Sequence, residues 1–244
     1  MRRILFLLSL ACCLHASAFE RERQNFNANW RMAVGDFKGA EAVDFNDRYW
    51  DAVTLPRAFN GHEAFARDIV DLTDTIVWYR KHFRLQNLAD KKVFVEFEGV
   101  RQGGEFWMNG RRLGMSTNGV MACGFDLTPY AQEGENVIAV RVDNSWTYRD
   151  PILNSRYQWN DRNFNANYGG IPKNAYLHQM GRLYQTLPLY SNLGTTGTYV
   201  YATNFDIPGH RATIHAESEV RNDDSRARSF FYYARVQDAK LVLV

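Results

Sequence analysis

The chain lacks an excess of charge of either sign. Its 29 Lys and Arg against 27 Asp and Glu give a formal net charge of +2, with no basic block. Without a strong positive field there is no electrostatic basis for binding nucleic acid or an anionic membrane surface. A run of about 20 apolar residues, which a membrane-spanning helix needs, is also missing. We therefore predict no nucleic acid and no membrane among its partners.

The only strongly apolar run belongs to the first eighteen residues, which resemble a secretory signal. Arg2 and Arg3 form the positive start, residues 4–14 are apolar, and residues 16–18 read Ala-Ser-Ala, a small-residue cleavage pattern. We expect cleavage near Ala18 and export to the periplasm or the extracellular space. Loss of the two arginines would bring the formal net charge from +2 to zero.

Cysteine is scarce. Of three cysteines, Cys12 and Cys13 lie in the expected signal, which leaves Cys123 alone. A single thiol cannot close an internal disulfide, so apolar burial has to hold the exported chain together. The six histidines are scattered, and no cysteine–histidine cluster has the spacing of metal ligands. We predict no structural metal and no cofactor.

Helical periodicity is missing too, because no segment before residue 185 keeps a helical pattern of apolar residues over three turns. Apolar and polar side chains alternate instead, as in 92–100, where Val93, Val95 and Phe97 share one face. Turn signals such as Asn-Gly and Thr-Pro separate these runs. Many short strands with such turns predict an all-β fold, a jelly-roll β-sandwich. The same alternation recurs in 78–85, 106–108, 136–143 and 174–180.

A composition change near residues 184–197, with Pro188 and two glycines, indicates a boundary. We expect a signal peptide over 1–18, a jelly-roll domain over 19–183, a linker over 184–197 and a truncated immunoglobulin-like domain over 198–244. The last region offers strand candidates at 198–206, 211–220 and 229–236. An immunoglobulin-like sandwich needs seven strands and about 100 residues, so this one would be incomplete. The alternative is a compact single domain with 241–244 as an edge strand.

Six short motifs follow one another along the chain. They are Trp50–Pro56 (W-x-x-V-x-L-P), Trp78–Phe83 (W-Y-R-K-x-F), Phe97–Val100 (F-E-G-V), Trp107–Gly110 (W-x-N-G), Val140–Asn144 (V-R-V-D-N) and Gly169–Ile171 (G-G-I). The Asn-Gly pair supplies the two positive φ values of a type I′ hairpin turn. In this order the motifs resemble the N-terminal sugar-binding domain of glycoside hydrolase family 2, the β-galactosidases, β-mannosidases and β-glucuronidases.

The resemblance implies a retaining exo-β-glycosidase, most like a β-galactosidase, whose two catalytic glutamates sit in a (β/α)8 barrel. The present sequence shows no pattern for that barrel. Glu96, Glu98 and Glu105 are expected to be carboxylates of a solvated strand face, and we assign catalysis to no residue. We therefore expect this portion to be inactive alone, with a carbohydrate and a downstream barrel domain as its partners.

The candidate ligand contacts come from the segment 154–170, NSRYQWNDRNFNANYGG. It is longer than most connections, and long ordered loops are often functional. Aromatic faces stack on sugars, while Asn, Asp and Arg bind hydroxyl groups. The alternative is simple turn chemistry, in which these side chains cap backbone groups. By position in the resembled family, the candidates are Asp161, its neighbours Asn160, Asn165 and Trp159, and Asp74 before the W-Y-R-K-x-F strand.

The leading hypothesis is therefore the non-catalytic N-terminal portion of an exported family 2 β-glycosidase, shaping the sugar pocket beside the barrel. Two other classes stay open. A free-standing carbohydrate-binding module would bind glycans in isolation, and a non-enzymatic β-sandwich interaction protein would not. Adding downstream domains would create hydrolytic activity only under the leading hypothesis.

Overall fold

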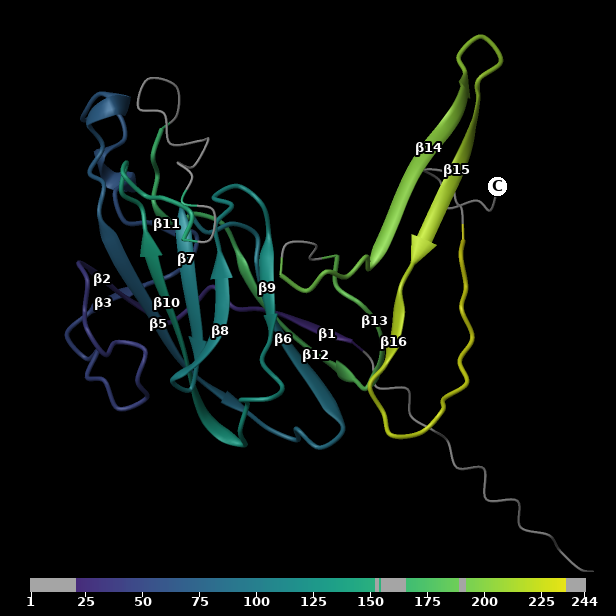
Figure 1. The fold of residues 1–244 in the computed structure, drawn as a ribbon, viewed down its shortest axis with the longest axis horizontal. Coiled ribbons are helices and arrows are strands. Elements are labelled where there is room, and N and C mark those ends of the chain that lie inside the picture. Colours follow the sequence, from purple (N-terminus) through teal and green to yellow (C-terminus); the bar gives the residue numbers. More distant parts are fainter. Residues whose placement is uncertain (1–20, 152–153, 155–165, 189–191, 236–244) are drawn as a thin grey trace, which may run out of the picture.

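The computed structural model describes residues 21–151, 154, 166–188 and 192–235 (Figure 1). Two antiparallel sheets form its main body, with strand orders β3-β2-β5-β10-β7-β8 and β1-β12-β6-β9. The predicted all-β sandwich is confirmed. Within the described ranges, no helix has the length and apolar character that crossing a membrane requires. The strands are β1 (Glu22–Asn25), β2 (Trp30–Val34), β3 (Asp51–Val53), β5 (Ile76–Leu85), β6 (Lys91–Phe97), β7 (Gly103–Met108), β8 (Arg111–Ser116), β9 (Cys123–Asp126), β10 (Gly134–Asp143) and β12 (Ala175–Gly181).

The core lies between the two sheets, on the faces that the alternation predicts. Val95 and Phe97 of β6 and Ile138 and Val140 of β10 are completely buried in one cluster with Trp30. Burying each such side chain stabilises the fold by about 1.5–3 kcal/mol, before the entropy of ordering it is counted. The period-2 pattern therefore places these residues correctly.

The predicted hairpin turn joins β7 and β8. Asn109 and Gly110 have φ values of 49° and 75°, as a type I′ turn requires. The Asn109 side chain also accepts a hydrogen bond from the backbone N–H of Val137 at 2.8 Å. The two turn residues therefore favour this turn locally, and the hydrogen bond from β10 stabilises it further.

The outer face of the six-stranded sheet is also covered, which alternation alone did not predict. Trp78 and Ala139 point away from the core and yet are buried, because Phe37 and Trp50 pack against them. We call residues 36–50 the cover segment. Since this sheet has buried side chains on both faces, its strands carry apolar residues at successive positions.

A buried ion pair fixes the cover segment. Arg80 is fully buried and donates from Nε to Asp47 Oδ2 at 2.8 Å and from Nη1 to the carbonyls of Ala40 and Ala42. His82 contacts the same carboxylate oxygen at 2.9 Å. Burial alone would raise the pKa of Asp47, but the bonds from Arg80 and His82 outweigh it and hold the pKa below its ordinary value.

The prediction of a solvated outer face on β6 is wrong for Glu96. Its side chain is 17% exposed, lies 3.8 Å from Arg23, and contacts His178 Nε2 at 2.7 Å. The error arose because sequence alternation does not show what β1 and β12 place beside β6. Burial would raise the pKa of Glu96, but the hydrogen bond from His178 and the nearby charges lower it overall.

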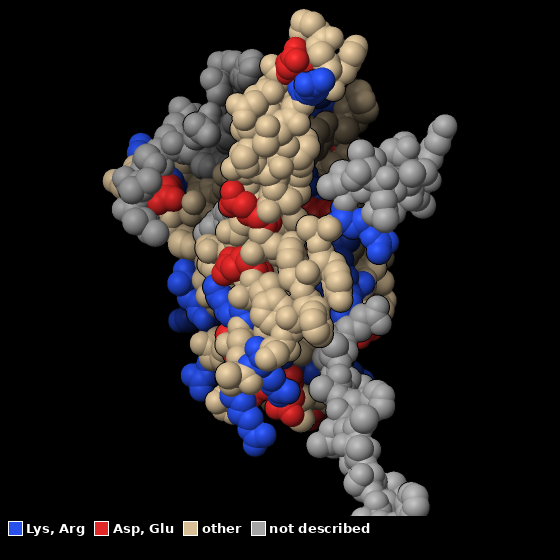
Figure 2. Space-filling view, turned by 90° about the vertical axis from the view of Figure 1, so that its right-hand side faces the viewer, with Lys and Arg blue, Asp and Glu red and all other residues tan. Residues whose placement is uncertain are grey.

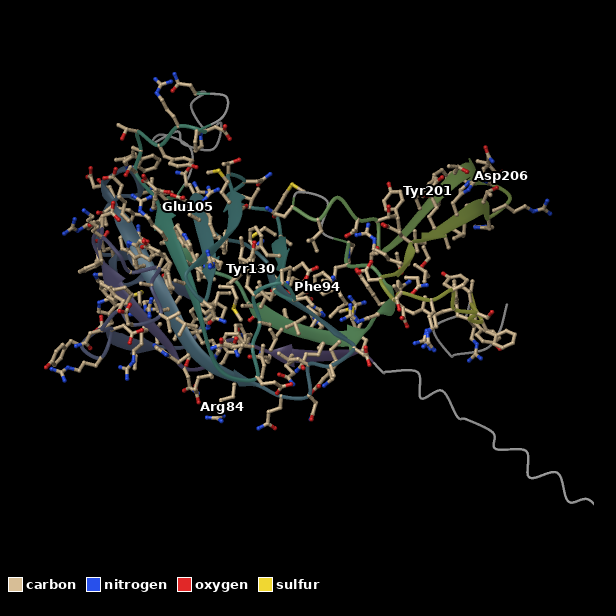
Figure 3. All side chains as sticks on the ribbon, turned by 60° about the horizontal axis from the view of Figure 1, so that its bottom comes forward. Arg84, Phe94, Glu105, Tyr130, Tyr201 and Asp206 are labelled. Carbon is tan, nitrogen blue, oxygen red and sulfur yellow. The ribbon has the colours of Figure 1, made fainter. Side chains whose placement is uncertain are left out.

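The chain beyond β12 attaches to the outer face of the four-stranded sheet. β13 (Leu183–Gln185) pairs with β16 (Val220–Asn222), and β14 (Thr198–Asp206) pairs with β15 (Arg211–Ser218) as a hairpin. Phe94 and Met180 of the sandwich pack against Tyr184 and Leu187 of this part. Figure 3 shows Phe94 on the side of the sandwich that faces this part, and Tyr201 on the hairpin.

The hairpin is largely open to solvent. Neither β14 nor β15 contains a buried residue, and the side of the molecule seen in Figure 2 is uncharged over most of the hairpin's length. The strand predicted over 229–236 is wrong for its described residues, 229–235, which form no strand. An extended segment becomes a strand only when another strand satisfies its backbone groups. The predicted division into domains stays a prediction.

Candidate functional site

One end of the sandwich gathers three loops around three buried asparagines, Asn60, Asn144 and Asn167, which we call the amide hub. Each of the three is 0% exposed. Asn60 follows β4 (Arg57–Ala58) and precedes the short 3-10 helices η1 (Gly61–Glu63) and η2 (Ile69–Asp71). Asn144 follows β10, and Asn167 precedes β11 (Gly170–Ile171). Figure 1 shows η1, η2 and β11 at this same end of the sandwich.

Asn60 ties two loops together with one side chain. Its Nδ2 donates to the carbonyl oxygens of Thr73 at 2.8 Å and of Asn167 at 2.7 Å. Its Oδ1 accepts from the backbone N–H of Gly169 at 3.1 Å. The loop 61–73 and the closing end of the segment 154–170 are therefore held by the same amide group.

Asn144 and Asn167 complete the hub. Asn167 Nδ2 donates to the Asn144 carbonyl at 2.8 Å, and Asn144 Nδ2 donates to the Asn167 carbonyl at 3.2 Å. Arg101 Nε and Gln102 Nε2 each donate to Asn167 Oδ1 at 3.2 Å. Buried amides pair with such partners because an unmatched polar group costs about 1–3 kcal/mol. The hub therefore joins the loops around it through buried hydrogen bonds.

The G-G-I motif is explained by the space available at the hub. A Cβ at Gly169 would lie 2.2 Å from the Asn144 side chain, and one at Gly170 would lie 2.2 Å from the Tyr79 hydroxyl. Gly170 also has a φ of +108°, which favours glycine. The Tyr79 hydroxyl donates to the carbonyl of Arg57 at 2.6 Å, which fixes β4 beside β11. Two glycines are therefore required for the backbone to approach this closely.

Of the five predicted contact residues, the structure places one. Asp74 is exposed and lies beside the hub, where its Oδ2 accepts from the backbone N–H of Trp146 at 2.9 Å. The backbone N–H of Asn144 donates to the Thr75 carbonyl at 3.0 Å, which brings Asp74 there. Asp74 thus orders the chain that enters the segment 154–170. The other four, Asn160, Asp161, Asn165 and Trp159, lie outside the described residues.

The loop 61–73 is closed at its base by a buried carboxylate. Glu63 Oε2 accepts from the Thr73 backbone N–H at 2.7 Å, and Oε1 accepts from its hydroxyl at 2.5 Å. Burial by itself would raise the pKa of Glu63, but these two bonds from Thr73 outweigh it and lower the pKa. The carboxylate therefore stays ionised at neutral pH and holds the two ends of the loop together.

The carboxylates considered for catalysis have structural partners. Glu96 contacts His178, Glu98 accepts from Asn174 at 2.8 Å, and Glu105 lies 3.5 Å from the guanidinium of Arg141. In the part of the chain that the structure describes, no three His, Cys, Asp or Glu side chains are grouped to hold a metal ion. The described side chains that meet in the hub are mainly amides, which both donate and accept hydrogen bonds.

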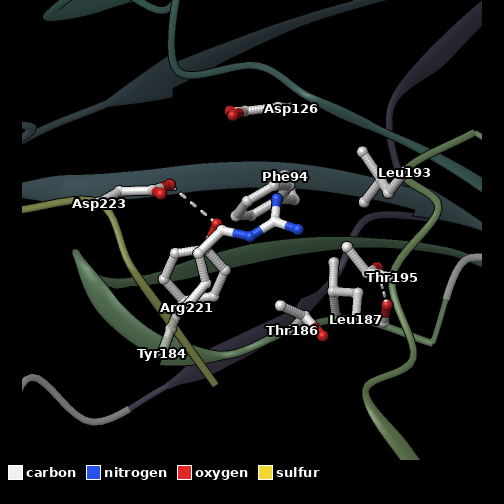
Figure 4. Close-up of a pocket in the computed structure, with 9 residues that line it drawn as sticks. All are labelled: Phe94, Asp126, Tyr184, Thr186, Leu187, Leu193, Thr195, Arg221 and Asp223. Atoms are coloured by element: carbon white, nitrogen blue, oxygen red, sulfur yellow. Dashed lines mark hydrogen bonds between the residues drawn. The ribbon is translucent and has the colours of Figure 1, made fainter. Parts of the chain in front are cut away.

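A separate cavity lies where the sandwich meets β13 and β16 (Figure 4). It measures about 70 Å³ and is lined by Phe94, Tyr184, Arg221 and Asp223 among others. The Tyr184 hydroxyl donates to Asp223 at 2.9 Å, and Lys92 binds the same aspartate at 3.1 Å. An apolar cavity that admits benzene measures about 150 Å³, so this one is too small for a sugar ring. It is a joint between two parts of the fold.

The sequence carries signals at each hub position, but none of them shows that the three asparagines meet. Asn60 belongs to an Asn-Gly pair that indicated a turn, and Asn144 is the last letter of V-R-V-D-N. Asn167 lies in the Asn-rich segment that pointed to sugar contacts. Three amides at the ends of strands were the available signal, yet only the fold shows that they meet.

The comparisons with known proteins match this architecture. The family model described as "Glycosyl hydrolases family 2, sugar binding domain" covers residues 23–180, from β1 to β12. The chain belongs to glycoside hydrolase family 2. A β-glucuronidase of Formosa agariphila is 38% identical over 90% of this family 2 chain. A β-galactosidase of Bacteroides ovatus is 30% identical over 94% of it.

Solved structures of family 2 enzymes show the same similarity. A family 2 β-glucuronidase superposes with a TM-score of 0.70 at 37% identity and covers 84% of this chain. The chain spans 23% and 25% of the length of the two curated relatives and 22% of that solved chain. The family 2 chain thus resembles the N-terminal portion of much longer glycosidases, as the motifs indicated.

Proposed function

We propose that this chain is the sugar-binding N-terminal portion of an exported family 2 exo-β-glycosidase. The catalytic barrel is carried elsewhere in the longer protein, and the ligand is a β-linked glycoside. The observation that carries this proposal is the family match over residues 23–180 together with the amide hub. The hub holds Asn167 and Gly169, at the closing end of the segment 154–170, with buried hydrogen bonds at one end of the sandwich.

Within that segment, Asp161 is the proposed hydroxyl-binding residue, with Asn160, Asn165 and Trp159 as further contacts. Asp74 has one carboxylate oxygen engaged by Trp146 and an exposed side chain beside the hub. It is the proposed second acidic contact. A carboxylate accepting from sugar hydroxyls forms charge-assisted hydrogen bonds, which are the stronger kind.

Export is part of the same proposal. It is supported by the charge, apolar run and cleavage pattern of residues 1–18 and by a described portion that holds one free thiol, the buried Cys123. N-terminal sequencing of the secreted protein is expected to find the mature chain starting near Phe19. A chain that retains residues 1–18 would contradict export by this signal.

The test uses the protein as its source organism produces it. We expect hydrolysis of p-nitrophenyl β-D-glucuronide or β-D-galactoside, and a loss of at least tenfold in kcat/KM for Asp161→Ala, since a hydrogen bond to a charged group is worth about 1.5–3 kcal/mol. Asp44→Ala, an exposed aspartate of the cover segment, is the matched control. Unchanged kinetics in Asp161→Ala and Trp159→Ala would reject these residues.

The open alternatives give different results in the same test. Glycan affinity without hydrolysis would indicate a free-standing carbohydrate-binding module. Neither affinity nor hydrolysis would indicate a non-enzymatic interaction protein.

A further inference from the structure

An asparagine followed by glycine is chemically labile, because the glycine has no Cβ to keep its backbone nitrogen away from the asparagine side chain. When that nitrogen attacks the side-chain Cγ, a C–N bond forms, the bond from Cγ to Nδ2 breaks, and ammonia leaves with the proton of the glycine N–H. Water then opens the resulting cyclic imide to aspartate or isoaspartate. The sequence holds three such pairs, at Asn60-Gly61, Asn109-Gly110 and Asn118-Gly119.

The fold holds the first two asparagines by segments far away in the chain. Asn60 is the fully buried amide of the hub, where both ends of its side chain are hydrogen-bonded. Asn109 Nδ2 donates to the Tyr130 carbonyl at 2.9 Å and to Asn136 Oδ1 at 2.8 Å. Its Oδ1 accepts from the Val137 N–H at 2.8 Å. Imide formation at either residue would therefore have to break bonds that join separate strands and loops.

Asn118 is held by its own loop, residues 117–122 between β8 and β9. Its Oδ1 accepts from the backbone N–H groups of Val120 and Met121, both at 3.2 Å. Because these donors come two and three residues later, the amide is turned forward over the peptide that contains the nitrogen of Gly119. Attack on Cγ places negative charge on Oδ1, and two donors already aimed at that oxygen stabilise such a charge.

Water, the second reactant, reaches this loop. Val120 is 41% and Met121 is 47% exposed, and Asn118 itself is partly exposed. The loop is also kept in place, since Lys173 Nζ donates to the Val120 carbonyl at 3.2 Å. The geometry that turns the amide forward is thus maintained in the folded protein, at a position open to solvent.

We propose that Asn118 is a site of spontaneous deamidation in the folded protein, and that the fold protects the other two Asn-Gly pairs. The product adds a negative charge to the loop that Lys173 contacts. Isoaspartate also lengthens the loop backbone beside Arg101, since a Cβ at Gly119 would lie 3.3 Å from Arg101 Cγ. This inference is independent of the proposed function, because it concerns the chemistry of the chain itself.

The experiment ages the full-length protein, as its source organism produces it, at pH 7 and follows each Asn-Gly peptide by digestion and mass spectrometry. The Asn118 peptide is expected to gain the mass difference between an amide and an acid, as a mixture of aspartate and isoaspartate. The Asn60 and Asn109 peptides are the internal controls and are expected to convert at least about tenfold more slowly, a barrier higher by about 1.4 kcal/mol. In urea, all three are expected to convert at similar rates.

Gly119→Ala is the matched variant. The added Cβ meets the flexible side chain of Arg101 at 3.3 Å, so the loop can accommodate it. It also hinders approach of the backbone nitrogen to Cγ, and conversion of Asn118 is expected to slow by about tenfold, again about 1.4 kcal/mol of barrier. Thermal unfolding of the variant is recorded in parallel.

Each result supports or overturns the inference. An Asn118 peptide that stays unconverted in the folded protein overturns it. So does equal conversion of all three pairs in the folded protein, since the fold would then select nothing. Wild-type conversion in a folded Gly119→Ala protein overturns the imide route. If that variant does not fold, isoaspartate at position 118 of the wild type decides, because only the imide produces it.

Discussion

The molecule contains two strand pairs of similar composition in opposite environments. One is β5 with β10 in the sandwich, and the other is the hairpin β14–β15. Both are antiparallel pairs rich in β-branched and aromatic residues. In β5 and β10, Tyr79 and Ile138 are 0% exposed, whereas on the hairpin Tyr199 is 48% and Ile214 is 56% exposed. The difference shows that alternation specifies strands, while burial depends on what other segments bring to each face.

The hairpin is held by contacts across its own two strands. Tyr201 and His215 stack at 4.6 Å with an angle of 9° between their rings, and Thr203 contacts the same histidine at 2.8 Å. Cross-strand pairs of this kind contribute about 0.2–1 kcal/mol each. The sandwich, by contrast, has a second sheet on one side and the cover segment on the other. Four substitutions test this contrast, from the largest expected effect to the smallest.

The buried ion pair is expected to give the largest effect. Asp47→Asn leaves the Arg80 guanidinium buried without its counter-charge and is expected to lower the free energy of unfolding by about 3–5 kcal/mol. The control Asp44→Asn, exposed on the same segment, should change it by less than about 0.5 kcal/mol. Urea denaturation at pH 7 measures both. Equal, small effects of the two substitutions would mean that the cover segment contributes little to the free energy of unfolding.

The Asp47–Arg80 ion pair also predicts how the stability of the fold changes in acid. The pKa of Asp47 is lower in the folded chain than its ordinary value of 3.8. The contribution of Asp47 to the free energy of unfolding is therefore complete above about pH 3.8. It is lost as the pH falls below that value toward the lower folded-state pKa. Unfolding measured from pH 7 to pH 2 should therefore show a smaller acid loss in Asp47→Asn than in the wild type. An identical slope in both proteins would contradict this assignment.

A matched pair of isoleucines compares the two regions directly. Ile138→Ala removes a fully buried side chain and is expected to cost about 2–5 kcal/mol, from lost burial and the remaining cavity. Ile214→Ala on the hairpin is expected to cost less than about 0.5 kcal/mol. Urea unfolding followed by circular dichroism measures both. A cost above 2 kcal/mol at Ile214 would show that the protein buries this hairpin.

The amide hub should fall between these extremes. Asn60→Ala leaves the Asn167 carbonyl and the Gly169 N–H without a partner, at a cost of about 1–3 kcal/mol. Hydrogen exchange of the Gly169 amide is expected to accelerate, since its acceptor is gone. The control Asn46→Ala, an exposed asparagine, should leave both measurements at wild-type values. Unchanged exchange at Gly169 would reject the hub as the support of the loops.

The joint between the two regions is expected to give a smaller effect than the hub. Tyr184→Phe removes the hydrogen bond to Asp223 and is expected to cost about 0.5–1.5 kcal/mol. Burial and the neighbouring Asp223 raise the pKa of the Tyr184 hydroxyl, so it remains a donor at neutral pH. Tyr199→Phe, on the exposed hairpin, is the control. If Tyr184→Phe lowered the free energy of unfolding more than Asn60→Ala, the joint would contribute more to stability than the hub.

The sequence by itself determined the strands, their inward faces and the hairpin turn at Asn109-Gly110. These features are local: a side-chain period of two and positive φ values follow from neighbouring residues. The family could be recognised for the same reason, because its motifs are short strands and turns. The sequence also pointed to the segment 154–170 as the candidate for ligand contacts, which stays a prediction.

Only the tertiary structure decided which polar residues are buried and which apolar residues are exposed. Asn60 and Asn167 are 107 positions apart and meet in one hydrogen bond, which no local pattern can show. Alternation predicts Glu96 in solvent, but β12 places His178 beside it, whereas the apolar ring of Phe65 is fully exposed. The physical reason is that burial is set by contacts between distant segments, whereas strand formation is set largely by neighbours.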